Sequence, residues 1–381
     1  MERFLSLTDS RISGKTDLER LKNAVIYAKS QEIKSISVPK KDENNDAWIF
    51  NGKVDIPDGF TVFLLSCKVI CKNDTFQSND SQKNAKVVAL GNTKIIKEDF
   101  NMKLGVITDC FKKGVEQGVI TASKLGLKGV QIYATTGEFS PETLTEEKIK
   151  EYNELLKENG LVISALCGDM GGHGFEIEED NAERIEKTKA IVDLAVKFGT
   201  KVVTTHIGVI PEDENHPRFQ TMLKALTACG EYAKTKGVTL AIETGPETAP
   251  TLYKFVSKTN GGVGVNLDPA NFVMVTGQNP AEAVYLLKDY IVHTHLKDGK
   301  MLKKTDPKII YDHFAEGGIE ALNVADFFIE TPIGEGDVNW DEYVKALNDI
   351  GFDGFLTIER ETGADPEKDI VAGMEFIKKY L

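Results

Sequence analysis

The sequence predicts an α/β protein in which a (β/α)8 TIM barrel follows a small N-terminal β-rich segment. Eight short β-prone runs alternate with amphipathic helical runs from Asn101 onward, over about 280 residues. That number of βα units in that length is typical of a (β/α)8 barrel. Residues before Asn101 follow a different pattern, with one helical stretch and then only short β-type runs.

The predicted strands of the barrel are Leu104–Ile107, Gly129–Tyr133, Val162–Cys167, Lys201–His206, Thr239–Glu243, Val263–Asp268, Ile291–His295 and Phe355–Glu359. Amphipathic stretches predict helices over Glu147–Asn159, Asn181–Phe198, Arg218–Lys236 and Trp340–Ile350. A glycine follows each of these stretches, as is common where helices end. The connection Asp298–Val338 is too long for a plain turn, and we expect it to cover the substrate.

Residues 1–100 are predicted to form a segment distinct from the barrel at residues 101–381. A capping pattern at Thr16-Asp17-Leu18-Glu19 and apolar residues at helical spacing predict a helix over residues 17–30. The β-type runs that follow are Ser35–Val38, Trp48–Val54, Thr61–Cys71, Lys86–Leu90 and Lys94–Ile96. Asp17–Ala28 and Val54–Val62 together resemble the opening of pectate-lyase-like β-helix proteins. Because two or three rungs cannot form an independent solenoid, we expect this segment to pack on the barrel or to mediate a homodimer.

The amino-acid composition limits which binding partners and which cellular compartment we expect for the protein. The 381 residues carry 46 basic and 59 acidic side chains, a net charge of −13, which opposes binding to nucleic acid. No apolar stretch of about 18 residues and no signal-peptide pattern occurs, so we expect a soluble, cytoplasmic protein without a membrane partner. Five cysteines without a CxxC pair argue against a disulfide framework and are expected to be buried.

Four predicted strands end in a side chain that can bind a metal ion: Glu243, Asp268, His295 and Glu359. Side chains alternate along a strand, and each of these residues shares its face with small or polar residues, while aliphatic residues occupy the opposite face. We therefore expect the four side chains to converge inside the barrel. Three carboxylates and one imidazole suit one divalent metal ion, Mn2+, Mg2+ or Co2+, with Zn2+ also possible. The alternative for each acid taken alone is a strand-end cap or an ion pair.

Five motifs in this order resemble those of the sugar phosphate isomerase/epimerase family, the xylose isomerase-like TIM barrels. They are TLAIETGP (239–246), NLDPAN (266–271), VHTHLKDG (292–299), GEGDVNW (334–340) and GFLTIERET (354–362). The resemblance runs from about Lys103 to the end of the chain. It implies that Glu243, Asp268, His295 and Glu359 bind the metal ion and that Glu243 and Glu359 exchange protons with the substrate. Within HTH the second histidine is taken as the ligand, and His293 is expected to be a hydrogen-bonded core histidine.

Five further residues are candidate substrate contacts: His173, His206, Asn271, Lys297 and Arg360. Asn271 stands where ketose 3-epimerases of the family have a histidine, three residues after the aspartate ligand. Lys297 and Arg360 can bind a phosphate or carboxylate, or stabilise enediolate charge. The alternative for either residue is an ordinary ion pair, and Arg360 stands between Glu359 and Glu361. His206 is equally compatible with a structural role. His173 lies in a glycine-rich loop.

These features predict a divalent-metal-dependent isomerase or epimerase of a sugar or sugar phosphate, acting by proton abstraction α to a carbonyl through an enediolate. An inosose-type dehydratase needs the same proton abstraction, and the sequence does not separate the two. A non-catalytic sugar-binding protein is the alternative from another class, and the intact four-residue set opposes it. Endonuclease IV-type nucleases need more metal ligands than six scattered histidines provide, and the acidic charge opposes DNA.

Overall fold

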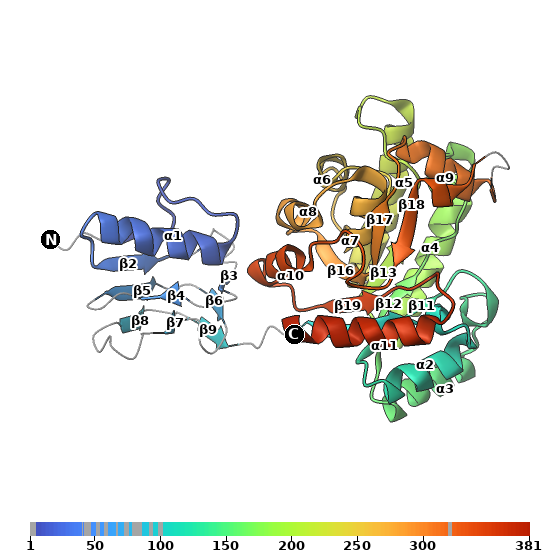
Figure 1. The fold of residues 1–381 in the computed structure, drawn as a ribbon, viewed down its shortest axis with the longest axis horizontal. Helices are drawn as coiled ribbons and strands as arrows, with labels where there is room; N and C mark the ends of the chain where they lie inside the picture. Colours follow the sequence, from blue (N-terminus) through green and yellow to red (C-terminus); the bar gives the residue numbers. More distant parts are fainter. Residues whose placement is uncertain are drawn as a thin grey trace. The chain divides into compact units, whose positions relative to one another are not determined.

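The computed structural model describes residues 5–39, 41, 47–50, 54–56, 60–65, 68–71, 76–77, 86–90, 94–97, 102–318 and 322–381. The chain divides into two compact units (Figure 1). One unit contains Met1–Asn101 and Val344–Asp353, and the other contains Met102–Tyr343 and Gly354–Leu381.

The larger unit is a closed barrel of eight parallel strands, which confirms the predicted fold. In chain order the strands are β10 (Lys103–Ile107), β11 (Gly129–Tyr133), β12 (Val162–Cys167), β13 (Val202–Thr205), β14 (Thr239–Glu243), β15 (Val263–Leu267), β16 (Ile291–Leu296) and β19 (Phe355–Ile358). Neighbours along the chain pair in parallel, and β19 closes the barrel against β10. β15 is buried along its whole length, as expected for a strand with side chains packed on both faces.

Helices follow the strands and cover the outside of the barrel (Figure 1). They are α2 (Gly114–Lys124), α3 (Glu146–Glu158), α4 (Glu178–Phe198), α5 (Pro217–Thr235), α6 (Ala249–Val256), α8 (Pro280–Leu287) and α11 (Pro366–Ile377). Helices α7 (Pro269–Asn271) and α9 (Pro307–Ala315) belong to the connections that follow β15 and β16. Helix α10 (Trp340–Asp349) precedes β19 in the chain. Gly199 ends α4 with φ of 71°, the left-handed conformation that glycine adopts at little cost.

The long connection after β16 is a folded layer and not a loose loop. β17 (Asp298–Met301) and β18 (Phe328–Thr331) form an antiparallel pair, with α9 and the short turn η4 (Val324–Asp326) between them. The Asp298 carboxylate accepts hydrogen bonds from the backbone of Gly334, Gly336 and Val338 and from Nε1 of Trp340. A Cβ on Gly336 would lie 2.0 Å from Oδ1 of Asp298, so only glycine permits this approach. One carboxylate therefore ties together the two ends of the connection.

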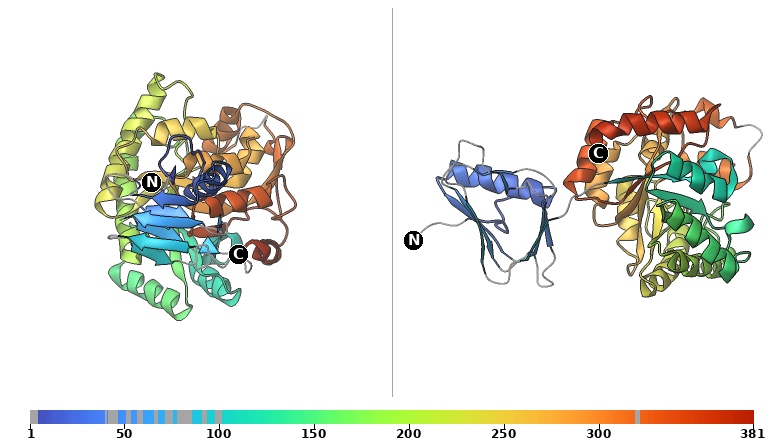
Figure 2. Two further views of the ribbon diagram at one scale, coloured as in Figure 1. Left: turned by 90° about the vertical axis from the view of Figure 1, so that its left-hand side faces the viewer. Right: turned by 90° about the horizontal axis from the view of Figure 1, so that it is seen from below.

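The smaller unit contains α1 (Asp17–Ser30) and three parallel sheets. β1 (Leu5–Ser6), β2 (Ser35–Val38), β5 (Thr61–Leu65) and β8 (Lys86–Leu90) form the first sheet, β3 (Ala47–Phe50), β6 (Lys68–Cys71) and β9 (Lys94–Lys97) the second, and β4 (Val54–Asp55) and β7 (Phe76–Gln77) the third. Two successive coils, β2–β3–β4 and β5–β6–β7, thus each add one strand to each sheet, as in a β-helix. Helix α1 contacts β2, β3 and β4, the strands of the first coil (Figure 2). Residues 57–59 of the Val54–Val62 motif lie outside the described residues.

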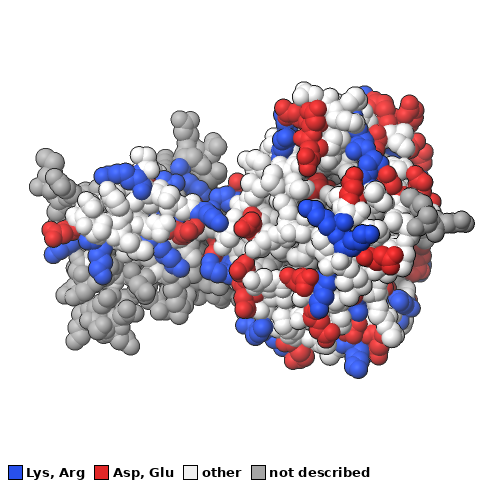
Figure 3. All heavy atoms as spheres, turned by 45° about the horizontal axis from the view of Figure 1, so that its top comes forward, with Lys and Arg blue, Asp and Glu red and all other residues white. Residues whose placement is uncertain are grey.

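The composition predicted buried cysteines and no membrane-spanning helix, and both can be compared with the described residues. Cys110, Cys167 and Cys229 are free and buried, as predicted, whereas Cys67 lies outside the described part. Among the described helices, none has the length and apolar character needed to cross a membrane. Acidic and basic side chains are interspersed over the face of the barrel unit that Figure 3 shows.

Candidate metal centre

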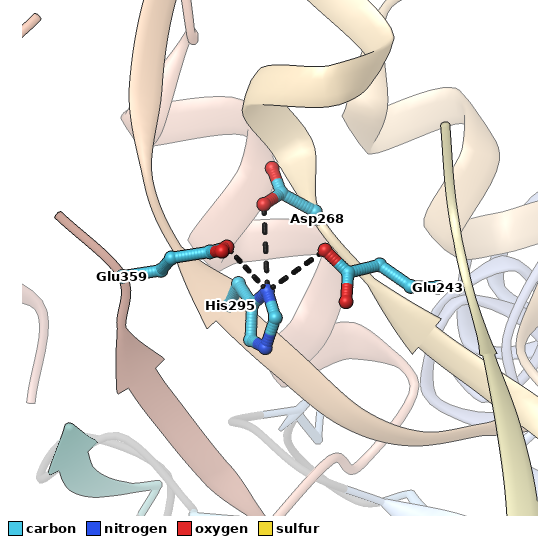
Figure 4. A group of neighbouring side chains, drawn as sticks. All are labelled: Glu243, Asp268, His295 and Glu359. Carbon is cyan, nitrogen blue, oxygen red and sulfur yellow. Dashed lines mark ion pairs between the residues drawn. The ribbon is translucent and has the colours of Figure 1, made fainter. Parts of the chain in front are cut away.

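The four side chains predicted to bind a metal ion converge at the carboxyl ends of the barrel strands (Figure 4). Nδ1 of His295 lies 3.3 Å from Oε1 of Glu243, 3.5 Å from Oδ2 of Asp268 and 2.8 Å from Oε2 of Glu359. One ligand atom of each residue lies within 4.8 Å of the other three, and all four residues are buried. The structure therefore brings together donors from β14, β15, β16 and β19.

Apart from ion-pair contacts, the ligand atoms that face the centre lack hydrogen-bond partners among the described residues. These atoms are Oδ2 of Asp268, Nδ1 of His295 and Oε2 of Glu359. A buried polar atom without a partner costs about 1–3 kcal/mol, so natural proteins rarely leave three of them side by side. A cation coordinated by these atoms would remove that cost. The donor set, three carboxylates and one imidazole, fits a divalent ion that accepts oxygen and nitrogen ligands.

Charge within the centre favours ionised carboxylates. Burial raises the pKa of Glu243, but His295 and His206 lower it more, and the net pKa is below the usual value. Burial also raises the pKa of Glu359, which Lys297 and His295 bring below the usual value. Burial lowers the pKa of His295, and Glu243 and Glu359 raise it well above the usual value. The negative charge of the carboxylates thus attracts whatever cation stands between them.

A polar network behind His295 orients its ring. Nε2 of His295 lies 3.2 Å from Oε1 of Gln131, while Nε2 of Gln131 donates to Oγ1 of Thr204. Nε2 of His295 also lies 3.1 Å from Nδ2 of Asn266, so polar side chains contact this nitrogen while Nδ1 faces the three carboxylates as the candidate ligand atom. His293 contacts Oε1 of Gln131 at 3.0 Å, and burial lowers its pKa to about 3, so it is a neutral core histidine as expected.

Gln131, which contacts His295 in this network, was not predicted from the sequence. Gln131 is 1% exposed and lies in the middle of β11, between apolar neighbours in the run Gly129–Tyr133. A polar residue inside a buried strand was the available signal, because a buried amide requires polar partners. Asn266 is a similar case: it is fully buried on β15, and its Nδ2 donates to Oε2 of Glu243 at 3.3 Å.

The Asp268 side chain divides its two oxygens between helix α7 and the metal centre. Oδ1 accepts hydrogen bonds from the backbone N–H groups of Ala270, at 2.7 Å, and Asn271, at 3.0 Å, and so caps α7. Pro269 occupies the first helical position, where its missing N–H is not needed. Nδ2 of Asn271 donates to the carbonyl of Thr244. The DPAN sequence therefore fixes the carboxylate with Oδ2 directed at His295.

The centre opens into a cavity of about 690 Å3. Glu243, His295 and Glu359 line it together with four predicted substrate contacts, His173, His206, Asn271 and Lys297. Residues of the long connection, from α9, η4 and β18, line it as well. The connection Asp298–Val338, which was expected to cover the substrate, thus forms part of the cavity wall.

The predicted substrate contacts lie at different distances from the metal centre. Nε2 of His206 is 3.6 Å from Oε1 of Glu243, and the His206 ring contacts Tyr311 edge to face. Nζ of Lys297 is 3.5 Å from Oε2 of Glu359 and 2.7 Å from Oε2 of Glu361. His173 lies farther out, 3.9 Å from both Asp312 and Glu316.

Arg360 is the predicted substrate contact that the structure places elsewhere. Its guanidinium forms ion pairs with Glu330 at 2.6 Å and Asp369 at 2.9 Å, and it donates to Oγ1 of Thr362. Arg360 is not among the described residues that line the cavity. Arg360 therefore forms ion pairs, with Glu330 and Asp369 where the sequence suggested an adjacent glutamate. Substrate binding by Arg360 stays a prediction.

Comparison with known proteins places the chain among similar barrels. An inosose dehydratase from Clostridium perfringens is 24% identical over 172 residues, which are 43% of this chain and 56% of that protein. The chain thus spans just over half the length of this relative.

Three solved structures share the fold. The crystal structure of a xylose isomerase domain protein from Planctomyces limnophilus is 25% identical, with a TM-score of 0.60 over 74% of this chain and 96% of the other. A D-psicose 3-epimerase solved in the presence of D-fructose is 16% identical, with a TM-score of 0.55, and the IOLI protein with a binding zinc atom is 19% identical, with a TM-score of 0.57. Each of these two matches covers 74% of this chain and 99% of the other.

A sequence profile matches residues 119–380, more than half of the chain. The profile describes the xylose isomerase-like TIM barrel, the family that the five motifs resemble. The closed eight-stranded barrel and the four converging ligand side chains agree with that match. The chain therefore belongs to the xylose isomerase-like TIM barrel family.

Proposed function

We propose that this protein is a metal-dependent isomerase or epimerase of a neutral sugar. The observation that carries the proposal is the set of buried ligand atoms of Asp268, His295 and Glu359 that lack hydrogen-bond partners among the described residues. The centre that they form opens into a large cavity, which Glu243, His295 and Glu359 line. Among the similar structures, a 3-epimerase solved with D-fructose and a protein with a binding zinc atom support a sugar substrate and a metal ion. The intact ligand set opposes a role in sugar binding alone.

Glu243, Asp268, His295 and Glu359 would hold one divalent ion. Such an ion supplies Lewis-acid polarisation of a carbonyl and stabilises the negative charge that follows proton removal. Glu243 and Glu359 come from strands β14 and β19 and lie on opposite sides of the His295 ring (Figure 4). One glutamate can remove the proton α to the carbonyl from one face of the sugar while the other returns a proton on the opposite face.

Lys297 is placed to act with Glu359. It is 6% exposed, and its Nζ lies 3.5 Å from Oε2 of Glu359. Burial lowers the pKa of Lys297, but Glu359 and Glu361 raise it well above the usual value, so the ammonium stays charged. It can donate to a substrate oxygen on which negative charge develops and keep Glu359 ionised as a base.

The charge of the cavity favours a neutral sugar over a sugar phosphate. Among the described lining residues, Lys297 is the single lysine or arginine. The acidic lining residues are Asp169, Glu176, Glu243, Asp312, Glu330, Glu359 and Glu361. Lys297 is paired with two of these acids, so a phosphate would meet mostly like charge.

Turnover in D2O tests the proton transfer. We expect deuterium at the carbon that changes configuration or oxidation state, because the proton held by a glutamate exchanges with solvent. Glu359→Gln should lower kcat at least ~100-fold, since the amide cannot accept the proton. The matched variant Glu335→Gln, at an exposed position in the long connection, should keep kcat. Full retention of the original hydrogen would contradict the mechanism and indicate a hydride shift.

An inosose-type dehydratase is the second candidate, favoured by the relative of that name. It uses the same first step, removal of a proton α to a carbonyl, and then expels a neighbouring hydroxyl. Mass spectrometry of the products separates the two reactions. An isomerase or epimerase leaves the mass unchanged, whereas a dehydratase yields a product that is lighter by one water.

A further inference from the structure

One side of the catalytic cavity is apolar. We call the residues Met274, Ile310, Phe314, Phe328 and Ile329 the apolar wall, and all five line the cavity that contains the metal centre. They come from the turn η3 (Phe272–Thr276), from α9 and from β18. Four of the five thus belong to the long connection after β16. Hydroxyl groups of a sugar gain no hydrogen bonds from these side chains.

The inner part of the apolar wall is fixed by packing. Met274 and Val275 form a buried cluster with Ala270, and Tyr311 and Phe328 pack against this cluster. Ala270 directly follows Pro269 in the α7 turn that Asp268 caps. The apolar wall is therefore anchored to the same segment that positions a predicted metal ligand. Such a preformed surface binds an apolar group at a low entropic cost.

The outer part of the apolar wall is exposed. Phe314 is 57% exposed and Ile329 is 40% exposed, and both residues line the cavity. Single exposed apolar residues are ordinary on protein surfaces. These two instead continue a buried apolar surface outward from the cavity, an arrangement that marks a binding site.

We infer that the substrate carries an apolar, aromatic group next to its polyhydroxylated part. This inference rests on the proposed function, which places the polyhydroxylated part at the metal centre. A cavity of about 690 Å3 is more than a monosaccharide alone requires and lies in the range, about 300–1,000 Å3, of sites for drug-sized ligands. The aromatic group stacks along Phe314 and Phe328 while the sugar ring faces His206, Asn271 and Lys297.

Continuity with the metal centre identifies the substrate as the occupant of the apolar wall. The apolar wall lines the same cavity as Glu243, His295 and Glu359, so a bound aromatic group and the reacting carbon lie in one space. The carboxylates around it disfavour an anionic appendage such as a phosphate. An aryl glycoside whose sugar carries a ketone at a carbon other than the acetal carbon has the required chemistry, because the proposed proton abstraction needs a carbonyl.

Binding of matched methyl and phenyl glycosides tests this inference without requiring turnover. The probes are the methyl and phenyl β-glycosides of glucose, galactose, xylose and mannose, titrated calorimetrically into the full-length, metal-loaded protein. For at least one sugar we expect the phenyl member to bind about tenfold more tightly than the methyl member. If no phenyl member binds more tightly than its methyl partner, the inference is overturned.

Two variants assign the preference to the apolar wall. Phe314→Ala should lower affinity for the preferred phenyl glycoside about fivefold or more, with unchanged metal content. Leu302→Ala is the matched control, because Leu302 is also exposed in the long connection, at 54%, but is not among the described lining residues. If Phe314→Ala changes the molecular mass of the protein in light scattering and leaves the affinity for the phenyl glycoside unchanged, the apolar wall mediates self-association. The inference is then wrong.

The outcome is separable from that of the proposed function. If the protein prefers phenyl glycosides but incorporates no deuterium, the aromatic subsite is supported and the proton-transfer reaction is contradicted. If the protein incorporates deuterium from D2O but binds methyl and phenyl glycosides equally, the reaction is supported and the aromatic subsite is contradicted.

Discussion

The Asp268 side chain serves both the local backbone and the metal centre, and these two roles can be separated by substitution. Oδ1 caps α7 through Ala270 and Asn271, whereas Oδ2 has no partner among the described residues and lies 3.5 Å from Nδ1 of His295. Asparagine caps helices about as well as aspartate, so Asp268→Asn should retain α7. It removes one negative charge from the ligand set, on which affinity for a hard divalent ion depends.

We therefore predict about one divalent ion per chain in the purified protein and loss of most of it in Asp268→Asn, measured by elemental analysis. The thermal midpoint of the variant should match that of the wild-type protein stripped of metal, because the cap remains. Asp169→Asn is the matched control: Asp169 lines the cavity but is not part of the cluster. A full complement of metal in Asp268→Asn would show that the ion is held elsewhere.

Glu247 is a buried carboxyl that follows the Glu243 motif, and it gives stability a dependence on pH. It is 4% exposed, and its Oε1 has no partner among the described residues. Burial raises its pKa to about 7, from 4.5 in an exposed glutamate. Between pH 4.5 and about pH 7, Glu247 holds a proton in the folded protein that it has released in the unfolded chain. The unfolding free energy must therefore fall as pH rises through this window.

Glu247→Gln should remove this dependence, because the amide does not titrate. A pKa difference of about 2.5 units corresponds to about 3 kcal/mol, so the variant should gain up to that amount over the wild type between pH 4.5 and pH 8. Urea unfolding of both proteins across this range measures the difference. An exposed substitution, Glu335→Gln, should leave the wild-type profile unchanged. A constant difference between Glu247→Gln and wild type would refute a titrating Glu247.

At this scale the sequence predicts which side chains converge better than it predicts the contacts that support them. Glu243, Asp268, His295 and Glu359 each stand at a strand end, and in a parallel barrel such ends share one rim. The bond between Gln131 and His295 joins residues 164 positions apart, and its existence depends on how β11 faces β16 across the barrel. The ion pairs of Arg360 likewise depend on β18 and α11, whose placement the sequence does not specify.

Among the elements, the two ends of the long connection are tied together by one carboxylate, that of Asp298. Asp298 accepts hydrogen bonds from four backbone N–H groups, those of Gly299, Gly334, Gly336 and Val338, and from the Trp340 indole. Donors surround both oxygens, so an amide in place of the carboxylate would turn its NH2 group toward an N–H group. The penalty is a lost charge-assisted bond together with an unsatisfied buried donor.

Asp298→Asn should therefore lower the unfolding free energy by at least about 2 kcal/mol. Because the damage falls at the base of the connection, amide hydrogen exchange should accelerate over residues 299–318 and 322–338 before it does so in the barrel strands. Asp326→Asn, exposed in the same connection, is the control and should change neither quantity measurably. Uniform acceleration over the whole barrel would show that Asp298 supports the core and not the connection.

The boundaries of the elements follow from local sequence wherever a run is long enough to show its period. All eight barrel strands were predicted to within one residue at each end, as was the helix over residues 17–30. β1 and β7, with two residues each, were missed because two residues have no detectable alternation. The β17–β18 pair was also missed, since Asp298-Gly299-Lys300-Met301 lacks β-prone residues and is extended because of its partner strand.

At the scale of the whole molecule, the chain contains a barrel and a smaller β-rich unit with its own core. The buried cluster of the smaller unit is drawn from Leu5 to Val69, with Leu21, Phe50 and Val62 fully buried. Among the described strands, β8 and β9 end their sheets. A terminal strand leaves backbone N–H and C=O groups unpaired along its outer edge and can pair with another chain.

Removal of residues 1–101 should therefore change the oligomeric state or lower the solubility while the barrel keeps its metal ion. Light scattering gives the number of subunits, and elemental analysis of the same sample gives the metal content of the remaining barrel.

A point variant in the full chain distinguishes a contact at the strand edge from a general effect of losing the segment. Val87 on β8 is 38% exposed, and Val87→Lys places a charge on that edge, which disfavours strand pairing. If strand pairing joins two copies, Val87→Lys should reduce the mass as the truncation does. A truncated protein that stays soluble with an unchanged number of subunits would rule out this role for residues 1–101.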